Sequence, residues 1–378
     1  MKRELTATAA FGLEAVVRRE VQALGYEVIK TEDGKVTFAG DERAIAAANI
    51  RLRTADRVFL HVAEFEAKEF EELYQMTRGI AWEELIPMDG KFDVIGSSVK
   101  SVLHSVPACQ SIVKKAVVDR LGSFYSMDRM PETGAEYRIK ISMLKDNATL
   151  TVDTTGPALH KRGYRVAPTA APLKETLASA LVQLSFWNPD RYLVDPTCGS
   201  GTIAIEAAMT GRNIAPGLTR RFASERWDII DPKIWKEERA KAYADIDTER
   251  PLHIEASDID AEAVGASMRN ADEAGVSDCI DFSVRDIRDF DTEEKYGIMI
   301  MNPPYGARIG DREAIENIYG ALRKFYAEHP DWSLFMITAD KNAERETLGR
   351  KADRRRKLFN GNIETTYYQF HGQKPPRE

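Results

Sequence analysis

The chain has 378 residues, of which 43% are hydrophobic and 30% charged, ordinary proportions for a globular protein. This length exceeds what one hydrophobic core usually supports, so we expect two or three domains. The formal net charge of −7 argues against non-specific coating of nucleic acid, which needs clustered positive charge. A local basic face stays compatible with that balance.

Targeting, membrane and metal-binding signals are missing from the sequence. Met1–Thr6 carries basic residues, but no apolar stretch of signal-peptide length follows it. No apolar run approaches the roughly eighteen residues of a membrane helix. Cys109, Cys198 and Cys279 are widely spaced and form no CxxC motif, so we expect neither a metal site nor a disulfide framework. We therefore expect a cytoplasmic protein with no metal and no membrane partner.

Residues 1–56 predict a small α/β domain. Apolar side chains recur at helical spacing over 12–24, and Gly25 follows where a helix C-cap is expected. The other expected elements are strands over 5–9, 26–29 and 35–38 and a helix over 41–50.

Residues 57–160 predict a second α/β domain with the same alternation. The expected elements are strands over 58–65 and 91–97, helices over 69–77 and 112–121, and a hairpin of 137–144 with 148–152. The string His160-Lys-Arg-Gly-Tyr-Arg165 then marks a junction, with four cationic or potentially cationic side chains beside one aromatic ring. Both a solvated linker and a hinge that contacts phosphate groups fit this composition.

Residues 161–378 alternate helices and strands as a doubly wound, mostly parallel sheet does. The expected strands are 192–194, 253–257, 280–284, 297–301 and 333–338, and the expected helices are 174–184, 202–209, 261–274 and 314–328. Segment 357–370 predicts an antiparallel hairpin, because Asn360-Gly361 supplies the positive φ angles of a tight turn. The charged, helical-looking segment from Arg220 to Arg250 matches no motif and receives no role.

The string Asp195-Pro-Thr-Cys-Gly-Ser-Gly201 predicts a nucleoside-binding loop between a strand and a helix. Gly199 and Gly201 lack Cβ atoms, so the backbone turns tightly and a ligand can approach it. The spacing is neither the dinucleotide fingerprint nor a phosphate loop, which disfavours a pyrophosphate ligand.

Two acids follow the next two strands. Asp258, in Ser257-Asp-Ile-Asp260, can accept hydrogen bonds from both hydroxyls of a ribose, whereas Asp260 is placed to cap the next helix. Asp286 can accept from an adenine amino group while Ile287 packs against the ring. Three acids at three strand ends predict one shared cofactor site.

The string Asn302-Pro-Pro-Tyr-Gly306 follows an apolar strand, which places it at the same sheet edge. The Asn302 side-chain oxygen and the Pro303 carbonyl can each accept one N–H of a planar amine. Because proline fixes φ and donates nothing, these acceptors are preorganised. Tyr305 offers a stacking face for a base that is unpaired or flipped out of a duplex. The motif predicts methyl transfer from S-adenosylmethionine to the exocyclic amine of a nucleobase.

These strings resemble the THUMP-domain RNA methyltransferases, specifically the bacterial group that modifies guanine N2 in 23S ribosomal RNA. The likeness covers Phe11-Gly-Leu-Glu14, the junction string, Lys174-Glu-Thr-Leu-Ala178, the extended glycine motif through Glu206-Ala-Ala, Asn302-Pro-Pro-Tyr-Gly306 and Asn360-Gly361. It implies a ferredoxin-like domain over 1–56, a THUMP RNA-binding domain over 57–160 and a class I methyltransferase domain over 161–378. Some members carry a second methyltransferase domain; none follows within these 378 residues, so we expect the guanine-N2 activity alone.

The expected site residues form three groups. The catalytic group is Asn302, Pro303 and Tyr305. The cofactor-binding group is Asp195, Thr197, Gly199, Gly201, Thr202, Asp258, Ile259, Asp286, Ile287 and Asn302. The RNA-binding group is His160, Lys161, Arg162, Tyr164, Arg165, Arg354 and Arg355, of which the last two belong to a run that also fits a solvated charged stretch. The alternatives are a tRNA guanine-N2 methyltransferase, an adenine-N6 methyltransferase, and a catalytically inert RNA-binding assembly factor.

Overall fold

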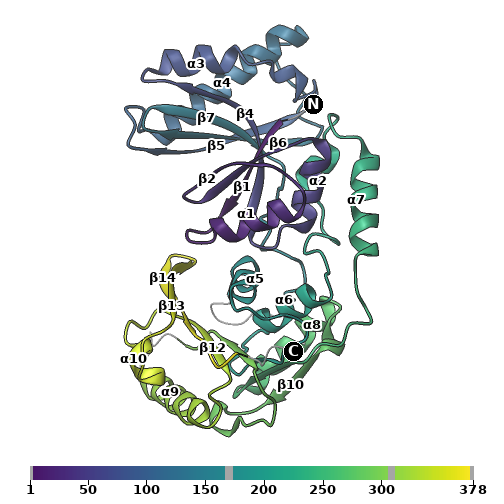
Figure 1. Cartoon of the computed structure of the whole chain (residues 1–378). Coiled ribbons are helices and arrows are strands. Elements are labelled where there is room, and N and C mark those ends of the chain that lie inside the picture. The colour runs from purple at the N-terminus through teal and green to yellow at the C-terminus, as the bar shows by residue number, and fades with distance from the viewer. Residues whose placement is uncertain (1–2, 167–172, 305–310, 375–378) are drawn as a thin grey trace. The chain divides into compact units, whose positions relative to one another are not determined.

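The computed structural model describes residues 3–166, 173–304 and 311–374. The chain forms two compact units. One comprises the chain up to Ala9, Arg18–Leu159 and Arg220–Lys241; the other comprises Ala10–Val17, His160–Thr219 and the chain from Ala242 onward. Within the residues described, each unit contains one seven-stranded sheet (Figure 1).

The N-terminal sheet has the strand order β2-β3-β1-β4-β7-β6-β5. Its elements in chain order are β1 (Arg3–Ala9), α1 (Glu14–Ala23), β2 (Val28–Glu32), β3 (Lys35–Gly40), α2 (Glu42–Arg51), β4 (Ala55–Glu66), α3 (Phe70–Arg78), β5 (Lys91–Val99), α4 (Val106–Tyr125), β6 (Glu136–Leu144) and β7 (Asn147–Asp153). Helix α4 begins six residues before the predicted Ile112, because Pro107 is compatible with a first helical turn.

Strand β4 joins the two expected N-terminal domains into one sheet. Its twelve residues pair with β1, where Leu5 lies opposite Leu60, and with β7, where Phe59 lies opposite Asp153. The predicted division between residues 56 and 57 therefore falls inside β4, just after it begins. The boundary itself stays a prediction, but the two parts share a continuous hydrogen-bonded sheet.

The second sheet has the strand order β10-β9-β8-β11-β12-β14-β13. The first five strands run parallel, and β14 and β13 add an antiparallel hairpin. The elements are α5 (Glu175–Leu184), β8 (Leu193–Asp195), α6 (Thr202–Gly211), α7 (Pro232–Ala244), β9 (Ile254–Asp258), α8 (Ala261–Glu273), β10 (Ile280–Val284), β11 (Ile298–Met301), α9 (Asp311–Glu328), β12 (Ser333–Thr338), α10 (Ala343–Leu348), β13 (Arg354–Asn360) and β14 (Ile363–Phe370).

The central strands are apolar because helices cover both faces of a parallel sheet. Every residue of β11 and β12 is buried. At the C-terminal hairpin, Asn360 pairs with Ile363, so the turn residues are Gly361 and Asn362. Only Gly361 has a positive φ, of 61°. The predicted hairpin is confirmed, but its turn lies one residue later than Asn360-Gly361.

Candidate cofactor and nucleobase site

The carboxyl ends of four adjacent parallel strands carry the predicted site residues. Asp195 ends β8, Asp258 ends β9, and Asn302 directly follows β11. Asp286 lies two residues beyond β10, after an intervening Arg285. Because β10, β9, β8 and β11 are neighbours in the sheet, these four positions share one edge. In open α/β sheets this edge is where ligands bind.

Asp258 organises the loop that follows β8. Its Oδ2 accepts the backbone N–H of Gly199 at 2.9 Å, and its Oδ1 accepts that of Asp260 at 3.0 Å. Asp260 caps α8 by accepting the N–H of Glu262 at 2.9 Å, as its position predicts. Asp260 therefore has the capping role that its position predicts, whereas the cofactor contact of Asp258 stays a prediction.

The two glycines of the loop differ in the space that a side chain would find at their positions. Both have positive φ, 53° at Gly199 and 78° at Gly201. A Cβ on Gly201 would lie 3.0 Å from the Cβ of Ser267, so Gly201 lets the loop pack against α8. A Cβ on Gly199 would meet nothing within 4 Å. Of the two, only Gly199 adjoins open space that a ligand could fill.

Asp195 shapes the loop from inside the protein. Its side chain is buried, and its Oδ1 accepts the N–H of Thr197 at 3.3 Å. Burial raises the pKa of the Asp195 carboxyl well above its ordinary value. Thr202, also predicted to contact the cofactor, is 4% exposed and exchanges a hydrogen bond with Ser200 at 3.1 Å.

Some hydroxyl groups near this edge are buried without a hydrogen bond in the described part of the chain. Among the described residues, the side-chain oxygens of Thr197, Ser257 and Ser283 are buried and make no hydrogen bond. Thr197 was predicted from the glycine motif, whereas the two serines were not among the predicted site residues. They lie on β9 and β10, one residue before Asp258 and three residues before Asp286. Buried hydroxyls without a partner are costly, which makes these positions candidates for contact with a polar ligand.

The Asp286 carboxylate accepts hydrogen bonds from Arg288, two residues later in the chain. Its Oδ1 accepts the N–H of Arg288 at 2.9 Å, and its Oδ2 accepts Nη2 of Arg288 at 2.7 Å. The hydrogen-bonded Arg288 lowers the pKa of the Asp286 carboxyl. Ile287 packs against the core beneath β11 and β12, whereas Ile259 is 68% exposed.

The nucleobase side of the site is described up to Pro304. Asn302 is half-buried, Pro303 is buried and Pro304 is exposed. Tyr305 lies outside the described residues, so its stacking role stays a prediction. Cys198 is a buried residue of the glycine loop, and burial raises the pKa of its thiol, which disfavours a thiolate nucleophile.

Two residues of the junction string, Arg162 and Tyr164, contact Glu206 of α6. The Arg162 side chain is 2% exposed and pairs with fully buried Glu206 at 3.3 Å. The Tyr164 hydroxyl donates to the same carboxylate at 3.1 Å, and Ser179 donates to it as well. A guanidinium with this burial cannot reach RNA, so we correct the RNA-binding assignment of Arg162 and Tyr164 to a structural one.

The other junction cations differ in exposure. Arg165 is 19% exposed and donates to Thr202 Oγ1 at 3.1 Å and pairs with Glu175 at 3.2 Å. His160 is half-buried, and burial together with Lys174 lowers the pKa of its imidazole to about 4. Lys161 is exposed and stays a predicted RNA contact.

Strand β13 presents the second predicted basic group at a sheet edge. Arg354 and Arg355 are both exposed, and Arg355 pairs with Glu344 at 2.7 Å. Charged side chains on an edge strand also prevent pairing with other chains. The contact of Arg354 and Arg355 with RNA stays a prediction.

Comparison with known proteins decides the family. Residues 162–369 match the family described as RMKL-like, methyltransferase domain. The chain belongs to this family. Residues 4–59 match the RlmL ferredoxin-like domain, and residues 67–153 match the THUMP domain. The predicted fold class and the assignment to THUMP-domain methyltransferases are confirmed.

Three relatives illustrate the similarity. The putative RNA methyltransferase YpsC of Bacillus subtilis is 52% identical over 371 residues, which cover 98% of this chain and 96% of the relative. Ribosomal RNA large subunit methyltransferase K/L of Shewanella pealeana is 33% identical over 98% of this chain but only 53% of the relative, so the chain spans about half its length. A putative methyltransferase solved in complex with SAH is 43% identical, with a TM-score of 0.93 and 99% of both chains covered.

These findings support S-adenosylmethionine as the cofactor of this methyltransferase fold. Within the described residues, no helix combines the length and apolar character needed to cross a bilayer. In the same part of the chain, no three His, Cys, Asp or Glu side chains gather so that they could hold a metal ion.

Proposed function

We propose that this methyltransferase transfers the methyl group of S-adenosylmethionine to the exocyclic N2 amine of an unpaired guanine in 23S ribosomal RNA. The observation that carries the proposal is the shared edge of β10, β9, β8 and β11, which brings Asp286, Asp258, the glycine loop and Asn302 together. The family match and the ribosomal RNA methyltransferase among the relatives support the substrate class. A ribosomal substrate also agrees with a cytoplasmic location.

The residues of the edge fit the cofactor. The Asp258 carboxylate accepts two backbone N–H groups and retains lone pairs for two ribose hydroxyls. Asp286 similarly retains acceptor capacity beside Arg288 for an adenine amino group. The unpartnered hydroxyl of Thr197 and the open space at Gly199 offer a hydrogen bond and room. When bound, S-adenosylmethionine supplies an electrophilic methyl group on a positively charged sulfur.

The chain's own contribution to the chemistry is to orient the amine. The lone pair of a guanine N2 amine is delocalised into the ring, which makes the nitrogen a poor nucleophile. The Asn302 amide oxygen and the Pro303 carbonyl would accept its two N–H groups and favour a tetrahedral nitrogen. Both acceptors follow a fully buried strand and Pro303 is itself buried, so their backbone positions are defined by the fold. No protein nucleophile is required, and the extra proton leaves to solvent.

The decisive experiment incubates the protein with labelled S-adenosylmethionine and separated 23S rRNA, 16S rRNA and tRNA. We expect label in 23S rRNA, and nucleoside analysis should identify N2-methylguanosine. Label in tRNA alone would replace the substrate by tRNA, and N6-methyladenosine would replace the target amine. No label in any RNA, with intact cofactor binding, would favour an inert RNA-binding factor.

A further inference from the structure

Two side chains of α8 donate hydrogen bonds to the glycine loop. Asn270 Nδ2 donates to the carbonyl of Ser200 at 3.1 Å. The Ser267 hydroxyl lies 2.7 Å from the carbonyl of Gly199 and 3.0 Å from that of Ala263 in its own helix. Asn270 and Ser267 are both fully buried, and their spacing of three residues places them on one face of α8. Helix α8 therefore contacts two successive carbonyls of the loop.

Asn270 also binds the backbone just after the junction string. Its Oδ1 accepts the N–H of Val166 at 3.0 Å, a bond that this N–H shares with the carbonyl of Tyr164 at 2.9 Å. The two partners define the orientation of the amide, because a carbonyl needs the Nδ2 donor and a backbone N–H needs the Oδ1 acceptor. One buried asparagine thus bridges Val166 and the glycine loop.

Arg165 reaches the same loop by a second route. Its Nη2 donates to Thr202 Oγ1 at 3.1 Å, and the hydroxyl groups of Thr202 and Ser200 are hydrogen-bonded at 3.1 Å. Arg165 is itself held by the Glu175 carboxylate at 3.2 Å and by the carbonyl of Leu173 at 2.8 Å. Both routes end at Ser200, which lies between the two glycines.

The position of Ser200 explains why such bonds matter. Glycine has more conformational freedom than any other residue, and both Gly199 and Gly201 adopt positive φ angles. A backbone flanked by two glycines needs contacts from outside the loop to keep one shape. Asp258 supplies one such contact at the N–H of Gly199, and Asn270 supplies another at the carbonyl of Ser200.

We propose that Asn270 and Arg165 are positioning residues for cofactor binding, which link the shape of the glycine loop to the order of the backbone at Arg165 and Val166. A ligand that binds the loop in this shape stabilises every contact that maintains the shape, and the effect is reciprocal. All of these residues belong to one compact unit. The proposal rests on the function proposed above, in which the glycine loop binds the cofactor.

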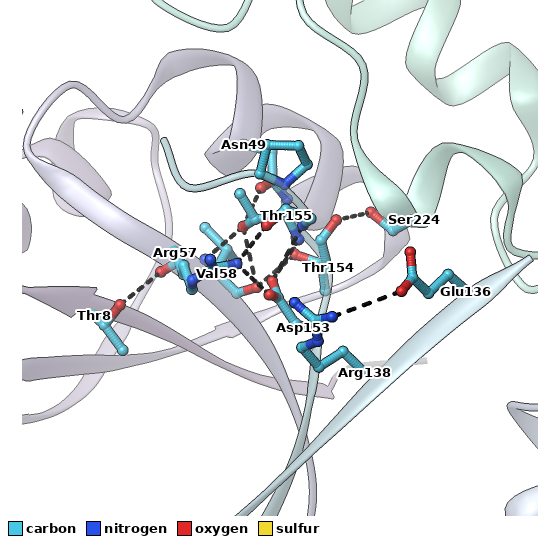
Figure 2. A network of polar contacts seen from close by, with 12 residues as sticks. Thr8, Asn49, Arg57, Val58, Glu136, Arg138, Asp153, Thr154, Thr155 and Ser224 are labelled. Atoms are coloured by element: carbon cyan, nitrogen blue, oxygen red, sulfur yellow. Dashed lines mark hydrogen bonds and ion pairs between the residues drawn. The ribbon is translucent and has the colours of Figure 1, made fainter. Parts of the chain in front are cut away.

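The test compares Asn270→Ala, which removes the bridge, with Asn49→Ala as the matched control. Asn49 is also fully buried and also bridges two groups: it donates to Thr154 Oγ1 at 2.8 Å and accepts from Thr155 Oγ1 at 2.7 Å (Figure 2). It belongs to the other compact unit, and these bonds are to the segment that follows β7. Both substitutions should therefore lower the free energy of unfolding.

Calorimetry with S-adenosylhomocysteine as the probe separates loop positioning from general stability. We expect Asn270→Ala to weaken binding of the probe at least about tenfold and Asn49→Ala to leave it unchanged. Arg165→Ala, at a partly exposed position, should weaken binding in the same direction and provides a test if Asn270→Ala does not fold. Unaltered affinity in the folded variants, or an equal loss in Asn49→Ala, would overturn the proposal.

Amide hydrogen exchange at Val166 gives a second readout, which a purely structural role of Asn270 would not alter. In the unaltered protein, saturating S-adenosylhomocysteine should slow exchange of the Val166 N–H at least about fivefold, because the ligand stabilises the bridge. The same ligand should not slow it in Asn270→Ala. Exchange at Val113 in α4, which belongs to the other compact unit, serves as the internal control. Equal exchange of Val166 with and without ligand would overturn the link.

These measurements separate the proposal from the proposed function. If the unaltered protein does not bind S-adenosylhomocysteine, both fail. If the affinities and exchange rates change as expected but no RNA is methylated, only the proposed function fails. If RNA is methylated and Asn270→Ala binds the probe normally, only the positioning role fails.

Discussion

The backbone N–H of Gly199 donates to the carboxylate of Asp258 at 2.9 Å, which ties the loop after β8 to the end of β9. One carboxylate thus holds the glycine loop in shape and is also the group that we propose binds the cofactor ribose. If that proposal holds, a change at Asp258 alters both the loop geometry and the affinity for the cofactor.

Asp258→Ala should weaken the binding of S-adenosylmethionine by about 1–3 kcal/mol, because ribose hydroxyls and the Gly199 N–H lose their acceptor. Isothermal calorimetry measures the change. Asp260→Ala is the matched control: it removes the α8 cap and should cost about 1 kcal/mol of unfolding free energy with little change in affinity. If Asp260→Ala weakens cofactor binding and Asp258→Ala does not, the ribose contact belongs to Asp260.

Asn302→Ala should reduce turnover by about 100-fold or more while cofactor affinity stays the same, since the amide acts on the nucleobase amine. Single-turnover methylation and calorimetry separate the two effects. Loss of cofactor affinity would instead show that Asn302 binds the cofactor and not the nucleobase.

Alanine substitutions should distinguish the two loop glycines. Gly201→Ala places a Cβ 3.0 Å from Ser267 at a φ of 78°, so the free energy of unfolding should fall along with cofactor affinity. Gly199→Ala carries the backbone cost of a positive φ, about 1–2 kcal/mol, but no clash within the protein. It should therefore fold and chiefly lose cofactor affinity. Equal affinity in Gly199→Ala and the unaltered protein would exclude close approach of the ligand.

Arg162→Ala should destabilise the protein by about 3–5 kcal/mol, because it leaves the fully buried Glu206 without its counter-ion. Urea unfolding measures this change. The neighbouring Lys161→Ala, at an exposed position, should leave stability unaltered. A stable Arg162→Ala protein with weakened RNA binding would restore the phosphate-contact hypothesis.

The imidazole of His160 should make the free energy of unfolding depend on pH. Its pKa is about 4 in the folded protein against an ordinary 6.5, so between these values the unfolded chain binds the additional proton. The contribution of neutral His160 to the free energy of unfolding is therefore fully present above pH 6.5. It decreases as the pH falls towards 4. Unfolding free energies between these limits should decline less steeply in His160→Gln. Identical slopes would show that the imidazole is equally accessible to protons in both states.

Local sequence patterns predicted most elements, because their causes are local. Strands β10 and β12 have the predicted bounds, and Asp260 caps α8 where the spacing indicated. The order of strand ends and acids also followed from the chain, since parallel strands carry their carboxyl ends to one edge. The methyltransferase assignment rested on those features.

Contacts between distant positions escaped prediction. The junction string reads as a basic surface, yet Arg162 is neutralised by Glu206, 44 residues later, and no periodic pattern encodes such a pairing. Likewise Gly201 packs against Ser267, which lies 66 residues later in the chain, and the local motif does not indicate this contact.

The sequence by itself determined the family, and it predicted the chemistry from a glycine loop, acids at successive strand ends and an amide after an apolar strand, each defined by neighbours along the chain. Only the tertiary structure decided which basic residues are buried, that β4 joins two predicted domains into one sheet, and that Arg220–Lys241 belongs to the same compact unit as the N-terminal sheet. The reason is physical. Burial and pairing depend on which surfaces meet, and that is set by the summed packing of segments far apart in sequence.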